Sequence, residues 1–246
     1  MIDVQRIDFI ARPVADVARA SEFYGETLGL PRNPSSDEHW AEYETSNLTI
    51  ALSEHGGLGL GVPDVGVARR TLEEAGVEFP REIYDSGVCH TSGFKDPAGN
   101  QLFLHHRYAP LERWNGEVTG VDRADFIGIP VTDRPAGVQF CNETLGLARN
   151  SLAHDEWPEF EPGNATVLLN TPEQTGTPFR PSNYAIALRV PDVAQSMQAL
   201  KDKGVEFQFE KAYDSGVCHM AFFNDPDGNS LILHHRHKPY SDGSLP

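Results

Sequence analysis

The stretch DFIARPVADVARASEFYGETLGL at residues 8–30 returns 117 positions later, at residues 125–147, as DFIGIPVTDRPAGVQFCNETLGL. Each copy opens with an apolar, β-rich run. An Asp and then apolar residues at helical spacing follow, and a glycine ends the pattern where a helix C-terminus favours a left-handed residue. The pattern predicts a strand followed by a helix in both places. Because the order and spacing agree, the chain is a tandem duplication.

The rest of the chain repeats as well. YDSGVCH at 84–90 returns at 213–219, and LHHR at 104–107 returns at 233–236. The shift grows in the second copy because a Pro/Thr/Gly-rich segment, 170–183, is added there, and its composition predicts a surface loop. We therefore expect two domains, 1–110 and 123–240, joined by a linker over 111–122.

Each copy also contains a coarser repeat. In the first copy, strand-like runs at 6–14, 40–46 and 48–54 surround a helical run at 16–30. The cycle restarts with a strand at 58–65, a helix at 65–76 and strands at 78–84, 88–94 and 100–106. This predicts an α+β fold in which each domain is βαβββ–βαβββ, with helices on one face of a mixed sheet and a concave face left open. A concave face is the expected place for a small-molecule site.

Charge and composition narrow the function classes. The 246 residues carry a formal net charge of −16 at pH 7, which opposes binding to nucleic acid or an anionic membrane surface. No apolar run is long enough to span a bilayer or serve as a signal peptide, so we expect a cytoplasmic protein. Three cysteines are too few and too scattered for a disulfide scaffold.

Several motifs together resemble the vicinal oxygen chelate superfamily, which includes glyoxalase I, the bleomycin and fosfomycin resistance proteins and the extradiol dioxygenases. They are the opening Ile-Asp-Phe-Ile with Leu-Gly-Leu, the Val-Pro-Asp-Val at 62–65 and 190–193, and Phe-x-Asp-Pro-x-Gly-Asn at 94–100 and 223–229. The likeness covers nearly all of both copies. It implies tandem glyoxalase/bleomycin-resistance/dioxygenase-like domains, while the fold alone leaves the reaction open.

Members of this superfamily typically hold a divalent metal at four positions that face the cup. By resemblance, none of these positions here carries a side chain that can bind a cation. We expect an apolar floor instead, with Phe9, Phe103, Phe126 and Ile232 facing the concave surfaces and contacting substrate. The positions carried over are Phe9 and Phe126, Ala51 and Leu168, Gly57 and Ala185, and Phe103 and Ile232.

Polar groups gather beside this floor. Strand alternation puts His105 on the same face as Phe103, and His234 on the same face as Ile232. The preceding strand brings Cys89-His90, or Cys218-His219, alongside, but only one residue of each pair can face the cup. The resemblance favours Cys89 with Thr91, and Cys218 with Met220. The opposite register would pair His90 with His105.

Two uses of this group remain open. His105, His234, His90 and His219 are candidate acid–base residues. Cys89, His105, Cys218 and His234 are candidate ligands for a divalent transition metal (Zn, Fe, Cu or Ni). The alternative to a metal is that these residues bind no cofactor. Apolar surroundings predict a lowered histidine pKa and hence a neutral imidazole at neutral pH.

Aromatic residues complete the candidate list. Trp40, Tyr43, Trp157 and Phe160 could stack on a planar ligand or pack in the core.

Three functional hypotheses follow: a lyase, isomerase or dioxygenase acting on a small oxygenated or aromatic molecule, a metal-free small-molecule-binding or antibiotic-sequestering resistance protein, and an inactive paralogue used for interaction. We expect open sheets that face each other in an internal pseudo-dimer, as a monomer or a homodimer.

Overall fold

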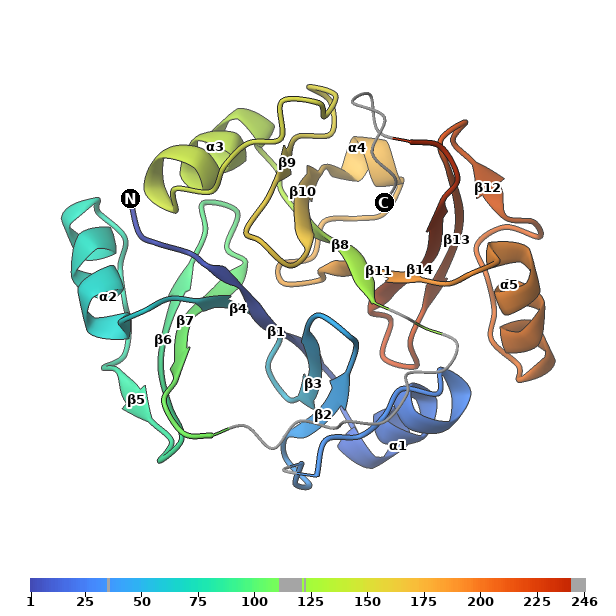
Figure 1. The fold of residues 1–246 in the computed structure, drawn as a ribbon, viewed down its shortest axis with the longest axis horizontal. Helices are drawn as coiled ribbons and strands as arrows, with labels where there is room; N and C mark the ends of the chain where they lie inside the picture. Colours follow the sequence, from blue (N-terminus) through green and yellow to red (C-terminus); the bar gives the residue numbers. More distant parts are fainter. Residues whose placement is uncertain (35, 111–120, 122, 240–246) are drawn as a thin grey trace.

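The computed structural model describes residues 1–34, 36–110, 121 and 123–239. The expected linker, 111–122, lies outside the described residues apart from Val121. The first half contains β1 (Arg6–Pro13), α1 (Val17–Ser21), a π-helical turn η1 (Glu22–Thr27), β2 (Ala41–Glu44), β3 (Thr49–Ser53), β4 (Gly57–Gly61), α2 (Val65–Glu74), β5 (Tyr84–Asp85), β6 (Cys89–Lys95) and β7 (Gln101–Arg107). These elements confirm the predicted βαβββ–βαβββ order (Figure 1).

The second half repeats this order with one added helix. It contains β8 (Ala124–Pro130), α3 (Arg134–Gln139), η2 (Phe140–Thr144), β9 (Glu159–Phe160), β10 (Thr166–Asn170), α4 (Pro172–Thr175), β11 (Ala185–Arg189), α5 (Val193–Asp202), β12 (Tyr213–Asp214), β13 (Cys218–Asn224) and β14 (Ser230–Arg236). Helix α4 lies in the added segment 170–183, which the sequence predicts only as a loop. A capping box begins this short helix and Gly176, with φ of 66°, ends it.

The repeated aspartates of the sequence begin the module helices. Asp16 precedes α1, Asp64 precedes α2, Asp133 precedes α3 and Asp192 precedes α5, and each side chain accepts a hydrogen bond from a backbone N–H in the first turn. These carboxylates satisfy donors that the helix leaves unpaired. The Asp repeat is therefore explained by helix capping.

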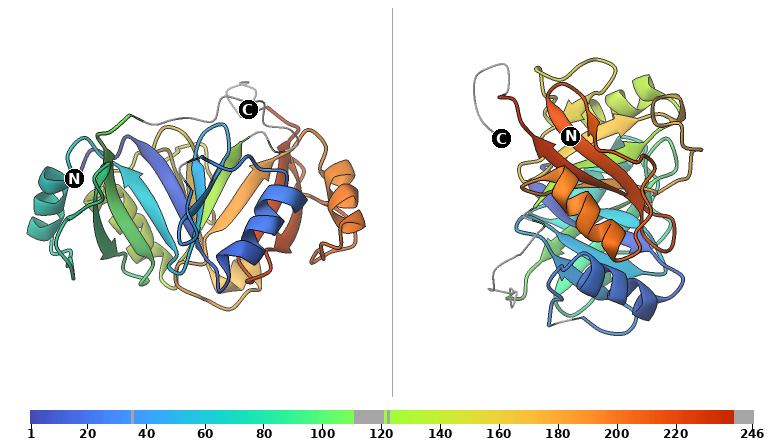
Figure 2. Two further views of the ribbon diagram at one scale, coloured as in Figure 1. Left: turned by 90° about the horizontal axis from the view of Figure 1, so that it is seen from below. Right: turned by 90° about the vertical axis from the view of Figure 1, so that its right-hand side faces the viewer.

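Each half forms one seven-stranded mixed sheet. The strand orders are β2-β3-β1-β4-β7-β6-β5 and β12-β13-β14-β11-β8-β10-β9, which are equivalent when one list is reversed. The sheets lie side by side, with α2 and α5 at opposite ends of the molecule (Figures 1 and 2). We call the concave face of the first sheet the first cup and that of the second sheet the second cup.

The two halves are joined by equivalent contacts. The Asn47 amide bonds the backbone of Ala124 and the Asn164 amide bonds the backbone of Ile7 in return. Helix-side residues also meet, as Phe94 does with Phe140, and one apolar core runs through both halves. The prediction that the open faces look at each other is therefore wrong, because the apolar helix-side surfaces are what the halves bury between them.

Candidate functional site

The site in the first cup begins with a bulge in β1. Ile7 pairs with Leu60 and Phe9 pairs with Gly59, so Asp8 is an extra residue between two ladder positions. A Cβ at Gly61 would lie 2.9 Å from the Asp8 carboxylate. The glycine therefore leaves space for this carboxylate over β4.

Asp8 on β1 orients His105, which lies on β7 at the other side of β4. Gly61 pairs with His105, and His105 Nδ1 lies 2.6 Å from Asp8 Oδ2. Arg6 Nε donates to the other carboxylate oxygen over 2.5 Å. The side chains of His105 and Asp8 are only 13% and 10% exposed. Both are held at the edge of the cup, and the His105 Nε2 atom is left for another partner.

Cys89 on β6 also interacts with the His105 side chain. Ser92 and Phe94 of β6 are buried on the helix side, so alternation turns Cys89 and Thr91 toward the cup. Thr91 pairs directly with His105, and the Cys89 thiol interacts with the His105 ring. The Cys89 Sγ atom also lies 3.1 Å from Ser86 Oγ in the preceding turn. The structure thus selects the register with Cys89 inside.

His90 and His219 are placed on the opposite face. His90 is paired with His106 across the β6–β7 ladder and approaches Asp85 at 3.6 Å, and His219 is paired with His235 and approaches Asp214 at 3.7 Å. The structure therefore does not bring either residue to His105 or His234. Strand alternation is the reason, since neighbouring residues point to opposite faces.

The charge state of His105 differs from the sequence prediction. Burial alone would lower the pKa of His105, but hydrogen bonds to Asp8 and Cys89 and their negative charge raise it to about 9. Despite burial, the contact with His105 and the Ser86 hydroxyl lower the pKa of the Cys89 thiol. The prediction of a neutral imidazole was wrong because it did not include the Asp8 carboxylate. The contact therefore makes both the imidazolium form of His105 and the thiolate form of Cys89 easier to reach than in the isolated side chains.

The second cup contains the same row with different support. His234 Nδ1 lies 2.5 Å from Asp125 Oδ2, and hydrogen bonds to Asp125 and Cys218 raise the pKa of His234 to about 9 against the effect of burial. Arg189, which pairs with His234, donates from Nε to Asp125 over 2.7 Å. Arg189 occupies the position of Gly61. Cys218 is 8% exposed and its Sγ atom lies 3.9 Å from Arg236 Nη1.

Aromatic rings fill the floor of the first cup. The Phe9 ring lies 6.1 Å from Phe103, 5.3 Å from His105 and 5.6 Å from Trp40 between centroids. Cβ atoms at Gly59 and Gly57 would lie 2.4 Å and 2.2 Å from the Phe9 and Phe103 rings. The rings therefore rest on a glycine strand, where the superfamily's metal positions fall by resemblance.

This floor does not fit the divalent metal that the fold family implies. Carbon side chains occupy the carried-over positions, and the rings take the space over β4. The neighbouring Cys89 and His105 supply two donor groups, whereas catalytic zinc sites use three protein ligands. Among the described residues, a cluster of three or more possible ligands is found only outside the cups, at Asp214, His219 and His237.

The floor of the second cup is less aromatic. Phe126 meets the His234 ring at 5.3 Å, Ile232 is 7% exposed, and Ala185 and Ala187 stand where β4 has glycines. Trp157 is 39% exposed. Phe160 and its counterpart Tyr43 are 0% and 2% exposed members of the apolar core, and Tyr43 Oη donates to the Ser21 carbonyl at the end of helix α1. The structure thus places these two aromatics away from the cups.

Sequence reasoning missed three acidic residues. Asp8 and Asp125 stand at the bulges, and Glu42 on β2 accepts a hydrogen bond from Trp40 Nε1 over 2.8 Å. Burial raises the pKa of Glu42 despite this bond. The sequence signal that could have identified these acidic residues is their repetition. Asp-Phe-Ile at 8–10 returns at 125–127, and Glu42 has Glu159 at the equivalent position.

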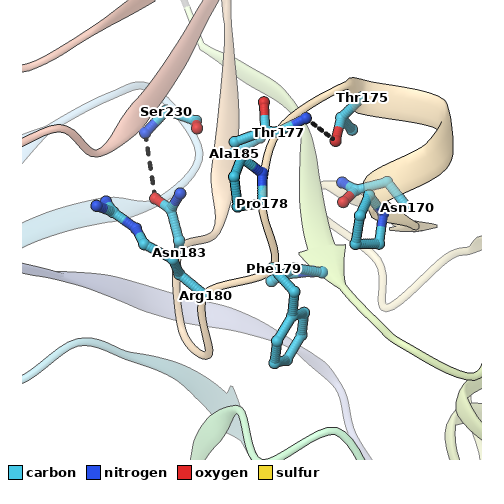
Figure 3. A pocket seen from close by; sticks show the side chains of 11 residues that line it. Asn170, Thr175, Thr177, Pro178, Phe179, Arg180, Asn183, Ala185 and Ser230 are labelled. Atoms are coloured by element: carbon cyan, nitrogen blue, oxygen red, sulfur yellow. Dashed lines mark hydrogen bonds between the residues drawn. The ribbon is translucent and has the colours of Figure 1, made fainter.

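The added segment 170–183 lines a pocket together with residues of β8, β11 and β14. Pro178, Phe179 and Arg180 line a shallow pocket of about 390 Å³, including its part open to solvent, together with Ala185 and Ser230 (Figure 3). The Arg180 guanidinium donates to the Gly228 carbonyl over 2.9 Å, which ties the segment to the turn before β14. The corresponding turn of the first half, between β3 and β4, is three residues long.

Comparison with known proteins defines the class. The sequence model of the Glyoxalase/Bleomycin resistance protein/Dioxygenase superfamily matches residues 6–104 and 123–233. The chain belongs to this superfamily, as the repeats and both sheets indicate. Among the curated proteins, none matches the sequence. No helix among the described residues is long and apolar enough to cross a membrane.

Solved structures share this fold at low identity. The Mn(II)-bound glyoxalase from Novosphingobium aromaticivorans is 16% identical, with a TM-score of 0.72 over 95% of this chain and 83% of its own. Homoprotocatechuate 2,3-dioxygenase from Arthrobacter globiformis is 18% identical, with a TM-score of 0.69 over 94% and 80%. The 2,3-dioxygenase LapB from Pseudomonas sp. KL28 is 14% identical, with a TM-score of 0.69 over 100% and 97%.

Proposed function

We propose that the first cup is the active site of an enzyme of the lyase or isomerase class that acts on a small carbonyl compound with an apolar or aromatic part. The observation that carries this proposal is the Asp8–His105–Cys89 row, in which the imidazole is held at Nδ1 by a carboxylate and also hydrogen-bonds a thiol. A nucleophile, a base and a group that orients the base are the parts that covalent catalysis requires.

The chemistry follows from the charge state. The Cys89 thiolate attacks the carbonyl carbon and forms a C–S bond, and the π electron pair of the carbonyl moves to its oxygen. That oxygen takes the Nε2 proton of His105, which leaves a thiohemiacetal and a neutral imidazole. The imidazole is then the base for the next proton transfer. Asp8 is a positioning residue, and the Phe9, Trp40 and Phe103 rings support the apolar part of the substrate.

Ring-opening dioxygenase chemistry is not part of this proposal, since it requires a redox metal for which the cup's residues are unsuited. The fit to a metal is nevertheless tested directly. Turnover of a panel of small aromatic aldehydes and α-oxo aldehydes is measured by absorbance before and after dialysis against EDTA. We expect turnover to survive dialysis and to be lost in Cys89→Ser and His105→Ala, with Cys218→Ser as the matched control. Turnover that EDTA removes and added metal restores would contradict the proposal.

A second candidate, a small-molecule-binding or sequestering protein, is supported by the aromatic floor of the first cup. Calorimetry on the same panel separates the two. Binding without any turnover, unchanged in Cys89→Ser and lost in Phe9→Ala, would favour sequestration over catalysis. A small molecule is the proposed partner in both cases, and cytoplasmic location remains a prediction.

A further inference from the structure

A second cluster of ligating groups lies outside the cups, on the hairpin at the outer edge of the second sheet. Asp214 ends β12, His219 stands opposite it on β13, and His237 follows β14. Asp214, His219 and His237 can each offer one ligand atom within 4.8 Å of the others. This places two imidazoles and a carboxylate together on the face of β13 that points away from the second cup.

The distances suit a small metal ion. His237 Nε2 lies 3.2 Å from Asp214 Oδ1, and His219 Nε2 lies 3.7 Å from Asp214 Oδ2. Two ligands of a tetrahedral zinc ion, each about 2.0–2.1 Å from the metal, are about 3.3 Å apart. The His219 and His237 rings are 4.5 Å apart between centroids at 30°, and the Nε2 atoms of both rings approach the same Asp214 carboxylate.

The backbone holds these groups in place. Asp214 Oδ1 accepts a hydrogen bond from Gly216 N over 2.7 Å, and Gly216 has the positive φ of 84° that this turn requires. His237 N donates to Val217 O over 3.0 Å, which ties the segment after β14 to the same hairpin. The Asp214 and His219 side chains are 57% and 46% exposed, so an ion can reach them from solvent.

The first half supplies a natural comparison. Its equivalent residues are Asp85, His90 and Tyr108, so the pair is kept but the third group is a phenol. Tyr108 Oη donates to Asp85 Oδ1 over 2.6 Å, and its ring lies 4.9 Å from His90. A neutral phenol that donates to the carboxylate competes with a cation for it, so the first half lacks the third ligand.

We propose that Asp214, His219 and His237 bind a divalent transition metal ion of the zinc class, with the remaining coordination positions open to water. Imidazole and carboxylate are ligands for this class of cation. The negative net charge of the chain also favours the approach of a cation. This site is independent of the chemistry proposed for the first cup.

The test uses Zn²⁺ alone, in calorimetric titrations of the full chain at pH 7.5. All variants are made in a Cys89→Ser/Cys218→Ser background so that the cup thiols take no metal. We expect the background to bind one Zn²⁺ ion. His237→Tyr introduces the residue that the first half has at this position. It should weaken Zn²⁺ binding by more than about tenfold, because it removes a ligand rather than an outer-shell partner. Tyr108→His should add a second site.

Circular dichroism verifies that each variant is folded, and a thermal scan gives a second readout. Zn²⁺ should raise the melting temperature of the background protein, and this increase should be lost in His237→Tyr. Equal Zn²⁺ affinity in the background and in His237→Tyr overturns the proposal. Loss of all Zn²⁺ binding from the background overturns it too, since it assigns the metal to the cup thiols.

Discussion

The two cups contain the same Asp–His–Cys row, but the strand that runs beneath the row, β4 or β11, has different residues in the two halves. β4 has Gly57, Gly59 and Gly61 where β11 has Ala185, Ala187 and Arg189. In the first cup the glycines leave room for two phenyl rings and the Asp8 carboxylate. In the second, Arg189 binds Asp125 and the thiol is buried. The same three residue types therefore have different surroundings in the two cups, because the residues of the neighbouring strand differ.

Removing the carboxylate should have the largest effect on stability. Asp8→Asn should lower the free energy of unfolding by about 2 kcal/mol near pH 6, since it leaves the buried His105 without its counter-ion. The pKa of His105 is raised to about 9, so this contribution is complete below pH ~6.5 and is lost as the pH rises through about 9. Urea unfolding of wild type and variant at pH 6 and 10 measures the loss.

Asp125→Asn is the matched variant in the second half. The part of the Asp125 contribution that comes from His234 is also lost as the pH rises through about 9, but a guanidinium keeps its charge in this range, so part of the cost of losing Asp125 should remain at pH 10. A loss at pH 10 that is no larger for Asp125→Asn than for Asp8→Asn would mean that Arg189 does not distinguish the two halves.

Filling the glycine strand should have the next largest effect. Gly59→Ala places a Cβ atom against the Phe9 ring and should cost about 1.5 kcal/mol, because a packed site resists added volume. Phe9→Leu in the same chain should recover part of this loss. Urea unfolding of the two single variants and the double variant checks the coupling. Additive losses would show that the ring does not rest on β4.

The smallest expected effects on the free energy of unfolding come from removing the two tryptophans, Trp40 and Trp157. Trp40→Ala should cost about 1 kcal/mol, since it removes an edge contact with Phe9 and a hydrogen bond to Glu42. Trp157→Ala should change stability by less than about 0.5 kcal/mol, because that side chain is largely at the surface. Thermal unfolding compares the two. Similar losses would remove this distinction between the cups.

The fold could be predicted from the sequence because the same helix-capping Asp and strand patterns recur in all four modules, and the Asp-Pro-x-Gly-Asn turn recurs in both halves. The concave direction of Phe9 followed from the resemblance, since the first strand has a fixed place in the family. Asp8 could not be placed, because a bulge in β1 breaks the alternation on which side-chain direction depends. The neutral-imidazole prediction failed for the same reason.

Two other residues show the limits of local pattern. Tyr43 and Phe160 alternate with acids as a cup-lining strand would, but their strands turn these rings into the core and the glutamates into the cup. A one-residue difference in register reverses the two sides. His90 and Cys89 posed the same question, and only the ladder with β7 answers it.

The most direct test of the account is the pKa of the Cys89 thiol. The rate of alkylation by iodoacetamide is followed from pH 5 to 10, with labelled peptides separated by mass so that Cys89 and Cys218 are read in the same sample. We predict that the alkylation profile of Cys89 is displaced to lower pH than that of an ordinary thiol, and that His105→Asn returns it to the ordinary profile while His234→Asn leaves it unchanged. An ordinary thiol profile for Cys89 in the wild-type protein, or one that His105→Asn does not alter, would contradict the account.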